Sequence, residues 1–410
     1  MDKTLKPNKL SGTVTVPSSK SQGHRALIAA ALAEGTSCLS GLFYSEDMIA
    51  TKNAMVAFGA EAKAEGNALV VTGASPSPKE NAIIDCGESG STIRFLIPLA
   101  WVCGKKVTFT GRGRLLSRPL DPYFALCNEQ GIGYEKTDGG VSFCGKLKGG
   151  TFRLPGNISS QFISGLLFAL PLLEADSRLE LTTEAESIGY IQMTLDVLSA
   201  FGITISHSAD FKTYEIAGHQ HYTPCDMTIE GDYSQAAFFL CANAMGSNVS
   251  VLGLNPESLQ GDKEIVDIIA RFGNPPSGIT IDVSQIPDLV PVLAVLASQA
   301  EGVTHITNAA RLRIKESDRL STTAEMLTNL GGRVTEHPDG LTIFGKATLE
   351  GGTVNAHNDH RIAMAAAIAS TVATGDVTIL GAECVKKSYG TFWDDFDRLV
   401  ENVQTAKARE

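Results

Sequence analysis

The sequence predicts an α/β protein built from repeated units, and three observations support this. The chain has 410 residues, of which 43% are apolar, enough for more than one buried core. One pattern then occurs six times: a polar or basic cluster, an Ala- and Leu-rich stretch, and a short β-branched run that usually ends at Gly or Asn. Such self-similarity is typical of repeat architectures. The Ala- and Leu-rich stretches of the six copies begin at Arg25, Arg94, Gln161, Gln235, Asp288 and Arg361.

Each repeat is expected to contain strands and two helices in a fixed order. The Ala-rich stretch predicts a buried helix, and the β-branched run predicts a strand. A second, amphipathic helix then ends at Gly, the usual left-handed helix cap. Two short alternating runs follow, which predict a β-hairpin. The segment from the Gly cap through the hairpin spans 58–73, 130–145, 201–218 and 330–345. The order predicted for a repeat is therefore βαβαββ.

Irregularities at three places predict how the chain is divided. Phe272-Gly273 runs directly into a single strand over Ile279–Val283, so we expect the fifth repeat to be truncated. The last repeat ends in a helix from Gly390 to about Val403, whereas a strand pair over Leu5–Val16 has no helix before it. The N-terminal strands are therefore expected to complete the last repeat. We predict two similar domains of three repeats each, 19–229 and 1–18 plus 230–410, in an inside-out, barrel-like α/β arrangement with the active site in the cleft between them.

The composition excludes several classes of protein. Lys and Arg number 34 against 45 Asp and Glu, which gives a net charge of −11 and disfavours nucleic-acid and anionic-membrane partners. The longest apolar run, Phe162–Leu173, contains Gly and Pro and is shorter than the roughly 18 residues of a membrane span. The first six residues contain no apolar run, so we expect no signal peptide, and the eight cysteines are scattered singly. We expect a reduced, cytoplasmic protein.

A polar cluster precedes the Ala-rich helix of every copy. Helix N-termini expose backbone N–H groups and the positive end of the helix dipole. Hydroxyl, Gly, Lys and Arg residues at such a place are typical of a phosphate or carboxylate site. Ordinary helix capping by Ser and Asp is the alternative explanation. The clusters, which we expect to face one cleft, cover 18–25, 88–94, 159–161, 232–235, 286–288 and 358–361.

Basic residues also gather outside these clusters. Lys315 and Arg319 stand at the start of a predicted helix, where cations are unfavourable against the dipole. A bound anion would explain their position. Histidine pairs such as His357 and His360 have no partner with metal-ligand spacing, so neither a metal nor another cofactor is expected. The other basic clusters contain Arg112, Arg114, Arg118, Arg311, Arg313, Lys386 and Lys387.

Six ordered motifs between Pro17 and Lys387 resemble one family. The two most specific are Lys315-Glu-Ser-Asp-Arg319 and Asn358-Asp-His-Arg361. With Pro17–Arg25, Ser117–Pro119, Ser159–Gln161 and Ile286–Asp288, they look like the signature of the 3-phosphoshikimate 1-carboxyvinyltransferases, also called 5-enolpyruvylshikimate-3-phosphate synthases. The fold of that family, two domains of three βαβαββ repeats, is similar to the one predicted from the repeats.

The resemblance implies a transferase of the shikimate pathway, which leads to chorismate and the aromatic amino acids. The enolpyruvyl group of phosphoenolpyruvate would pass to the 5-hydroxyl of 3-phosphoshikimate through a tetrahedral intermediate, with release of phosphate. By family position Glu316 would donate the proton and Asp288 would accept it, with pKa values tuned to those roles. Lys20 would be the third catalytic residue and touch both substrates.

The resemblance also implies two sets of binding residues. Those for 3-phosphoshikimate are Lys20, Ser21, Arg25, Ser159, Ser160, Gln161, Ser187, Asp288 and Lys315. Those for phosphoenolpyruvate are Lys20, Gly90, Arg118, Gln161, Arg319, Arg361 and Lys387, with Arg residues as bidentate anion ligands. Tyr190 is a weaker candidate. Glu88 and Arg311 stand where the family often has Asn.

Two other functions are considered. UDP-N-acetylglucosamine 1-carboxyvinyltransferase shares the fold but commonly carries a Cys in the loop that corresponds to Arg112–Arg118, where this chain has none. A non-catalytic anion-binding repeat scaffold would keep the cations but would not need Glu316 or Asp288. We expect a monomer that acts on the two small substrates and binds neither nucleic acid nor membrane.

Overall fold

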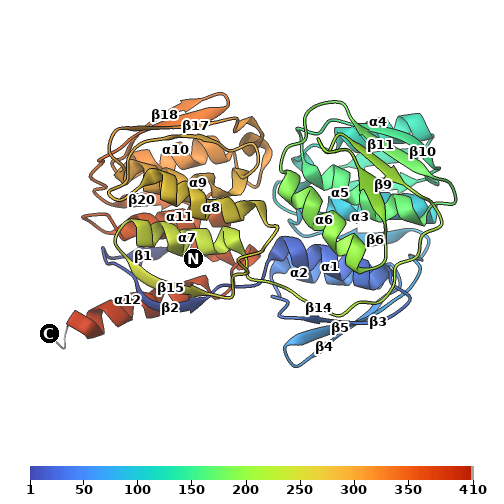
Figure 1. Cartoon of the computed structure of the whole chain (residues 1–410), viewed down its shortest axis with the longest axis horizontal. Coiled ribbons are helices and arrows are strands. Elements are labelled where there is room, and N and C mark those ends of the chain that lie inside the picture. The colour runs from blue at the N-terminus through green and yellow to red at the C-terminus, as the bar shows by residue number, and fades with distance from the viewer. Residues whose placement is uncertain (408–410) are drawn as a thin grey trace. The chain divides into compact units, whose positions relative to one another are not determined.

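The structure is a computed structural model that describes residues 1–407, with side chains described to residue 403. The chain packs as two compact units (Figure 1). The N-terminal unit is Ser18–Glu230, and the C-terminal unit combines Met1–Pro17 with the chain from Gly231 onward. The boundaries expected from the sequence lay one residue away from each of these. None of the helices described is long and apolar enough to cross a membrane.

The N-terminal unit contains three four-stranded sheets with the same topology. In each sheet the first two strands are parallel, and the hairpin that follows adds two antiparallel strands. The first sheet has the order β14 (Met227–Thr228), β3 (Gly35–Ser40), β5 (Ala68–Gly73) and β4 (Glu61–Glu65). The second is β6 (Ala82–Asp85), β7 (Val107–Thr110), β9 (Gly140–Cys144) and β8 (Gly133–Thr137). The third is β10 (Gly150–Leu154), β11 (Ser177–Leu181), β13 (Thr213–Ile216) and β12 (Ile205–His207).

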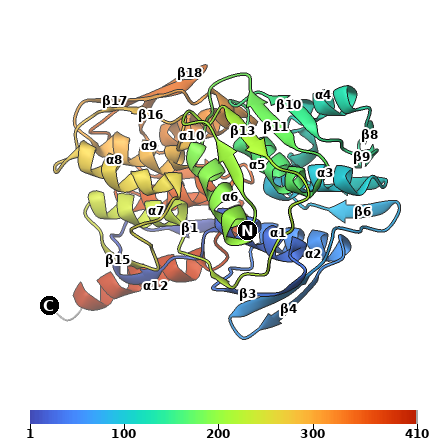
Figure 2. The same ribbon diagram turned by 45° about the vertical axis from the view of Figure 1, so that its right-hand side comes forward.

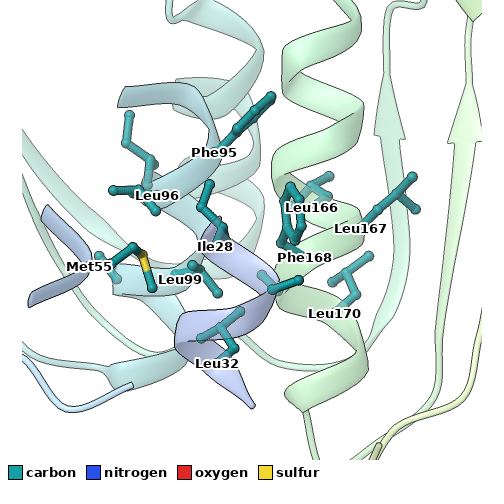
Figure 3. Close-up of a cluster of buried hydrophobic side chains, with 14 of the residues drawn as sticks. Ile28, Leu32, Met55, Phe95, Leu96, Leu99, Leu166, Leu167, Phe168 and Leu170 are labelled. Atoms are coloured by element: carbon teal, nitrogen blue, oxygen red, sulfur yellow. The ribbon is translucent and has the colours of Figure 1, made fainter. Parts of the chain in front are cut away.

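Three helices form the centre of this unit, and three more lie outside them. The central helices are α1 (Lys20–Leu32), α3 (Gly90–Cys103) and α5 (Ser160–Ala169). Their apolar residues point in all directions, as expected for helices that are covered on every side. Ile28, Leu96, Leu99 and Phe168 from these helices meet in one core (Figure 3). The outer helices are α2 (Glu46–Ala57), α4 (Asp121–Gln130) and α6 (Ile188–Ala200), with short 3₁₀ turns η1 (Leu115–Ser117) and η2 (Leu170–Leu172).

The C-terminal unit repeats this plan around α7 (Tyr233–Ala244), α9 (Val290–Gln299) and α11 (His360–Ser370). Every residue of α11 is buried, and α7 lies beside α9 in both views (Figures 1 and 2). The outer helices are α8 (Ile265–Phe272), α10 (Arg319–Asn329) and α12 (Phe392–Lys407). The 3₁₀ turns are η3 (Gly261–Glu264), η4 (Pro287–Leu289), η5 (Ala310–Ile314) and η6 (Ala382–Lys387).

The sheets of the C-terminal unit differ in size. One has four strands in the order β16 (Thr280–Asp282), β17 (Val303–Thr307), β19 (Gly340–Phe344) and β18 (Arg333–His337). The next is β1 (Lys3–Leu5), β21 (Val377–Leu380) and β20 (Gly352–Asn355). The last has only β15 (Asn248–Leu252) and β2 (Ser11–Thr15).

The N-terminal strands complete this unit differently from the expectation. β1 pairs antiparallel with β21 of the last repeat, but β2 pairs parallel with β15 of the fourth repeat. The two strands are therefore not a hairpin. The N-terminal segment thus adds one strand to each of two sheets, which otherwise have two strands from the last repeat and one strand from the fourth.

The truncated repeat is the fourth and not the fifth. The strand after Phe272-Gly273, β16, pairs parallel with β17 and so opens the fifth repeat. The missing hairpin belongs to the repeat of α7, β15 and α8, whose sheet stops at two strands. Asn243 at the end of α7 partly replaces it: its amide Nδ2 donates to the Val249 carbonyl and its Oδ1 accepts from the Val249 N–H, both at 2.8 Å.

Candidate functional site

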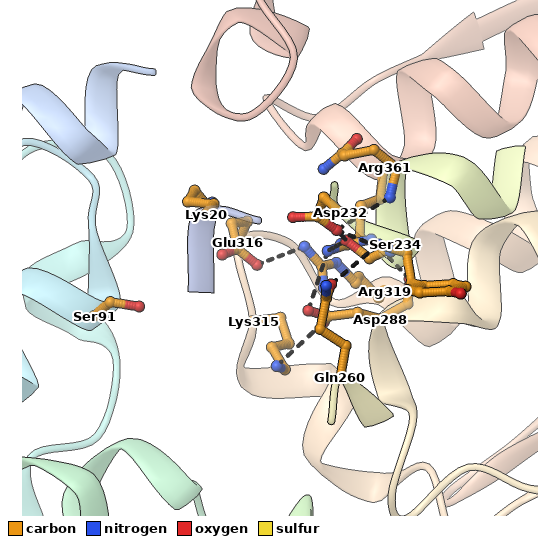
Figure 4. Close-up of polar contacts among 12 residues, drawn as sticks. Lys20, Ser91, Asp232, Ser234, Gln260, Asp288, Lys315, Glu316, Arg319 and Arg361 are labelled. Atoms are coloured by element: carbon orange, nitrogen blue, oxygen red, sulfur yellow. Dashed lines mark hydrogen bonds and ion pairs between the residues drawn. The ribbon is translucent and has the colours of Figure 1, made fainter. Parts of the chain in front are cut away.

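Helix starts in the C-terminal unit carry a cluster of buried or half-buried charges (Figure 4). Asp288 lies in η4 directly before α9, Lys315 and Glu316 lie between η5 and α10, and Arg319 is the first residue of α10. Arg361 is the second residue of α11. These five residues come from three helix starts, and ion pairs and hydrogen bonds bring all of them together.

Three cations surround the Asp288 carboxylate. Oδ1 accepts from Arg319 Nη1 at 2.8 Å and from Lys315 Nζ at 3.4 Å, and Oδ2 accepts from Arg361 Nη2 at 3.1 Å. The side chain is 17% exposed. Burial by itself would raise the pKa of Asp288, but Arg361, Lys315 and Arg319 outweigh it and hold this pKa well below its usual value. Burial lowers the pKa of Lys315.

Arg319 contacts three carboxylates of its own chain. Besides Asp288, its Nε donates to Asp359 Oδ2 and its Nη2 donates to Glu316 Oε2, both at 2.7 Å. The side chain is only 1% exposed. Burial opposes its charge, but the three carboxylates raise its pKa above the ordinary arginine value. Acidic side chains of the same chain thus compensate Arg319, the cation whose position at the start of α10 suggests a bound anion.

The two expected catalytic carboxylates are not helix caps. Asp318, not Glu316, caps α10, because its carboxylate accepts from Ser321 N. Neither η4 nor α9 has a side-chain cap. Glu316 is 22% exposed and contacts Arg319. Helix capping therefore does not explain either residue.

Capping is nevertheless present in the other polar clusters. The capping residues of the five central helices concerned are Ser19, Ser89, Ser159, Asp232 and Asp359. Asp359 also accepts from Arg319 and from the Ser317 hydroxyl, so it orients Arg319 as well as the start of α11. Ser159 is thus both a cap and an expected binding residue, and the caps leave Lys20, Gly90, Ser160 and Arg361 in the first turns.

One further expected residue, Lys387, lies close to these helix starts. Lys387, at the end of η6 and 7% exposed, donates from Nζ to the Asn358 carbonyl at 2.8 Å. Arg361 also donates to Ser234 Oγ, at the start of α7, at 3.1 Å. Sequence reasoning missed Gln260, which accepts from Tyr233 N and donates to the Gly231 carbonyl. No motif marked this residue.

In the N-terminal unit, Lys20 begins α1. Its ammonium donates to Asp47 Oδ2 on α2 at 2.8 Å, and the two side chains are 21% and 15% exposed. Sequence reasoning missed Asp47, since nothing in its local pattern separates it from an acidic residue in the first turn of a helix.

Arg25 connects α1 with α5 and α6. Its guanidinium donates to Ser21 O and Thr194 Oγ1, each at 2.7 Å, to Tyr190 O at 3.0 Å and to Ser164 Oγ at 3.4 Å. Burial lowers its pKa to about 10. The weaker candidate Tyr190 therefore contributes its backbone carbonyl, and its ring lies near the Arg25 guanidinium. Ser187, at the start of α6, is buried and has a left-handed backbone, with φ 57°.

Gln161 links the starts of α3 and α5. Its Oε1 accepts from Arg94 Nη1 at 2.7 Å, and its Nε2 donates to Ser91 Oγ at 2.9 Å. Ser159 and Ser160 precede it, with Ser160 buried.

Arg118 covers Gly90. A Cβ atom added at Gly90 would lie 2.9 Å from Arg118 Nη1. Glu88, the departure from the family pattern, lies over Gly113, where an added Cβ would be 2.8 Å from its carboxylate. Arg311, the other departure, donates to the Ser284 carbonyl.

Comparisons with known proteins agree on one family. A family model described as EPSP synthase (3-phosphoshikimate 1-carboxyvinyltransferase) matches residues 5–396. The 3-phosphoshikimate 1-carboxyvinyltransferase of Clostridium kluyveri is 47% identical over 413 residues, covering 97% of this chain and 96% of that protein. That of Clostridium acetobutylicum is 48% identical over 417 residues, covering 97% of each. The solved structure of EPSP synthase from Acinetobacter baumannii has a TM-score of 0.81 and 27% identity, covering 97% of this chain and 98% of that one. This chain belongs to the EPSP synthase family.

Proposed function

We propose that this chain transfers the enolpyruvyl group of phosphoenolpyruvate to the 5-hydroxyl of 3-phosphoshikimate and releases inorganic phosphate. The observation that carries the proposal is the match to the EPSP synthase family over residues 5–396. The cluster of Asp288, Glu316, Arg319 and Arg361 supports it, since it combines two carboxylates with cations suited to two phosphorylated substrates.

The reaction needs one proton donor and one proton acceptor. In the addition step the 5-oxygen of 3-phosphoshikimate forms a bond to C2 of phosphoenolpyruvate, its proton passes to a base, and a proton is added at C3. In the elimination step C3 loses a proton and the bond from C2 to the phosphate oxygen breaks. We propose Glu316 as the group that gives and recovers the C3 proton and Asp288 as the group that accepts the hydroxyl proton.

The ion pairs of Asp288 suggest how its basicity is controlled. A carboxylate paired with three cations is a weak base, because its pKa is held well below its usual value. We propose that the carboxylate and phosphate of phosphoenolpyruvate compete for Arg319 and Arg361. When phosphoenolpyruvate is bound, Asp288 pairs less strongly with these two cations, and its pKa rises. Without phosphoenolpyruvate the pKa of Asp288 stays low.

The remaining roles follow the family positions. We propose that Lys20 contacts both substrates and that Gly90, Arg118, Gln161, Arg319, Arg361 and Lys387 hold phosphoenolpyruvate. For 3-phosphoshikimate we propose Ser21, Arg25, Ser159, Ser160, Gln161, Ser187, Asp288 and Lys315. The burial of Arg118, Arg319, Arg361 and Lys387 supports this, because charge-assisted hydrogen bonds are stronger where water is excluded.

The setting of the enzyme is a further part of the proposal. The net charge of −11 supports small-molecule substrates over nucleic acid or an anionic membrane. We propose a cytoplasmic monomer, which size-exclusion chromatography at several concentrations would test.

The decisive experiment measures phosphate release from phosphoenolpyruvate by the purified chain. Parallel reactions contain 3-phosphoshikimate, UDP-N-acetylglucosamine or no acceptor. We expect release only with 3-phosphoshikimate. Release only with the nucleotide sugar would assign the other transferase activity, and binding of phosphoenolpyruvate without release would favour a scaffold.

A further inference from the structure

Two neighbouring residues of α1 connect it to different helices. Arg25 contacts α5 and α6, as described above. His24 faces α2 and α3, and it is completely buried. No role follows for His24 from the motifs or from the proposed reaction, although it lies one turn after Lys20 in α1.

His24 begins a chain of four buried hydrogen-bonding side chains. Its Nδ1 lies 2.7 Å from Thr51 Oγ1 on α2, and Thr51 Oγ1 lies 2.6 Å from Thr92 Oγ1 on α3. Thr92 Oγ1 donates to Ser89 Oγ at 2.7 Å. Each of these four residues is at most 1% exposed. The hydrogen-bond chain therefore joins the second turns of α1 and α2 to the first turn of α3 through buried side chains.

The direction of the chain follows from counting hydrogens. A threonine hydroxyl has one hydrogen. Thr92 gives its hydrogen to Ser89, so Thr51 must donate to Thr92. Thr51 then has no hydrogen left for His24, and His24 must donate from Nδ1. The arrangement requires the Nδ1–H form of the imidazole.

A neutral imidazole fits this requirement. Burial, followed by the positive charges of Lys20 and Arg25, lowers the pKa of His24 well below its usual value. The other ring nitrogen, Nε2, is buried and has no hydrogen-bond partner among the described residues. His24 thus acts as a neutral side chain that donates one hydrogen bond from Nδ1.

The far end of the chain holds the start of α3. Ser89 Oγ also accepts from Thr92 N and so caps α3. The next residue, Gly90, lies so close to Arg118 that a Cβ atom would be 2.9 Å from its guanidinium. A small displacement of the first turn of α3 would therefore change the space between Gly90 and Arg118.

We infer that His24 is a positioning residue for phosphoenolpyruvate: through Thr51, Thr92 and Ser89 it fixes Gly90 relative to Lys20 at the start of α1. This inference rests on the proposed function, which places Gly90 and Lys20 at that substrate. On this inference His24 and Arg25 have different roles: His24 positions the start of α3, whereas the contacts of Arg25 hold α5 and α6.

The test compares variants that interrupt the hydrogen-bond chain from His24 to Ser89 with variants that preserve it. Thr51→Val removes the hydroxyl at nearly constant volume, and His24→Leu removes the donor. Thr51→Ser keeps the hydroxyl, and His24→Asn places an amide N–H where Nδ1 lies. The matched control is Thr304→Val, which removes a buried hydroxyl in β17 that does not belong to the hydrogen-bond chain. For each variant KM for both substrates, kcat and thermal unfolding are measured.

We expect Thr51→Val and His24→Leu to raise KM for phosphoenolpyruvate about tenfold while KM for 3-phosphoshikimate changes by less than about twofold. Thr51→Ser and His24→Asn should remain near the wild type, and the double variant His24→Leu/Thr51→Val should be no worse than the single ones, because both break one chain.

Three results would overturn the inference: an unchanged KM for phosphoenolpyruvate in Thr51→Val, equal changes of both KM values together with a lowered Tm, or no rescue by His24→Asn. The proposed function has its own readout, since it fails if the wild-type chain releases no phosphate. In that case the inference fails with it, whereas an active wild type with unaffected variants rejects the inference alone.

Discussion

Replacing Asp359 by Asn tests whether the buried charges of the C-terminal unit act as one network. Asp359 is fully buried and holds Arg319 at 2.7 Å. Asn keeps the shape and an oxygen that can accept from Arg361 N, but it leaves Arg319 without its most buried carboxylate. Removing one partner of a buried pair costs about 3–5 kcal/mol. Because Arg319 retains Asp288 and Glu316, we expect the lower end, about 3 kcal/mol.

The assay is urea and thermal unfolding of the wild type and the Asp359→Asn variant. A loss of about 3 kcal/mol corresponds to a Tm lower by about 6–12 °C for a unit of this size. Asp397→Asn is the control, because it breaks the ion pair between Lys3 and the exposed side chain of Asp397 and should cost less than about 1 kcal/mol. A loss for Asp359→Asn no larger than the control would refute the network.

The pH dependence of this difference has a defined sign. Burial alone would raise the pKa of Asp359, but Arg319 outweighs it and the pKa in the folded chain is lowered. A carboxyl with a lowered folded pKa stabilises the fold fully above its unfolded pKa of about 3.9. The stability difference between wild type and variant should therefore be constant near neutral pH and shrink as the pH falls below about 4.

Three other substitutions test separate parts of the structure. Glu316→Gln should reduce kcat about a hundredfold or more with little change in KM, as expected for a lost proton donor; Glu325→Gln, an exposed residue paired with His357, is the control, and near-normal turnover of Glu316→Gln would remove that role. Gly90→Ala should fold but push the Arg118 guanidinium aside and raise KM for phosphoenolpyruvate about tenfold, which an unchanged KM would contradict. Asn243→Ala should leave Val249 N–H and C=O on β15 without their side-chain partner and lower the free energy of unfolding by about 1–3 kcal/mol. Unaltered urea unfolding would show that these two hydrogen bonds do not stabilise the fold.

Local patterns carried most of the fold. The hairpin expected within 58–73 is confirmed by β4 and β5, and the single strand expected at Ile279–Val283 is confirmed by β16. The expected C-terminal helix begins at Phe392 and continues to Lys407. These elements follow from alternation, Gly caps and turns, which neighbouring residues in the sequence decide. The prediction that both N-terminal strands complete the last repeat was wrong for Ser11–Thr15. This strand pairs with β15, and the two segments lie more than two hundred residues apart in the sequence.

By itself the sequence determined the six repeats, the family and the residues that the family implies, because these depend on residue types at short, ordered spacings. Only the tertiary structure decided which of these residues contact each other. Arg319 meets Asp288, Glu316 and Asp359, and His24 reaches Ser89 through two threonines of different helices. Side chains in such networks come from separate helix starts, and their distances depend on how the helices pack. Local periodicity contains no information about that packing, so a buried threonine such as Thr51 resembles any other core residue until the helices are placed.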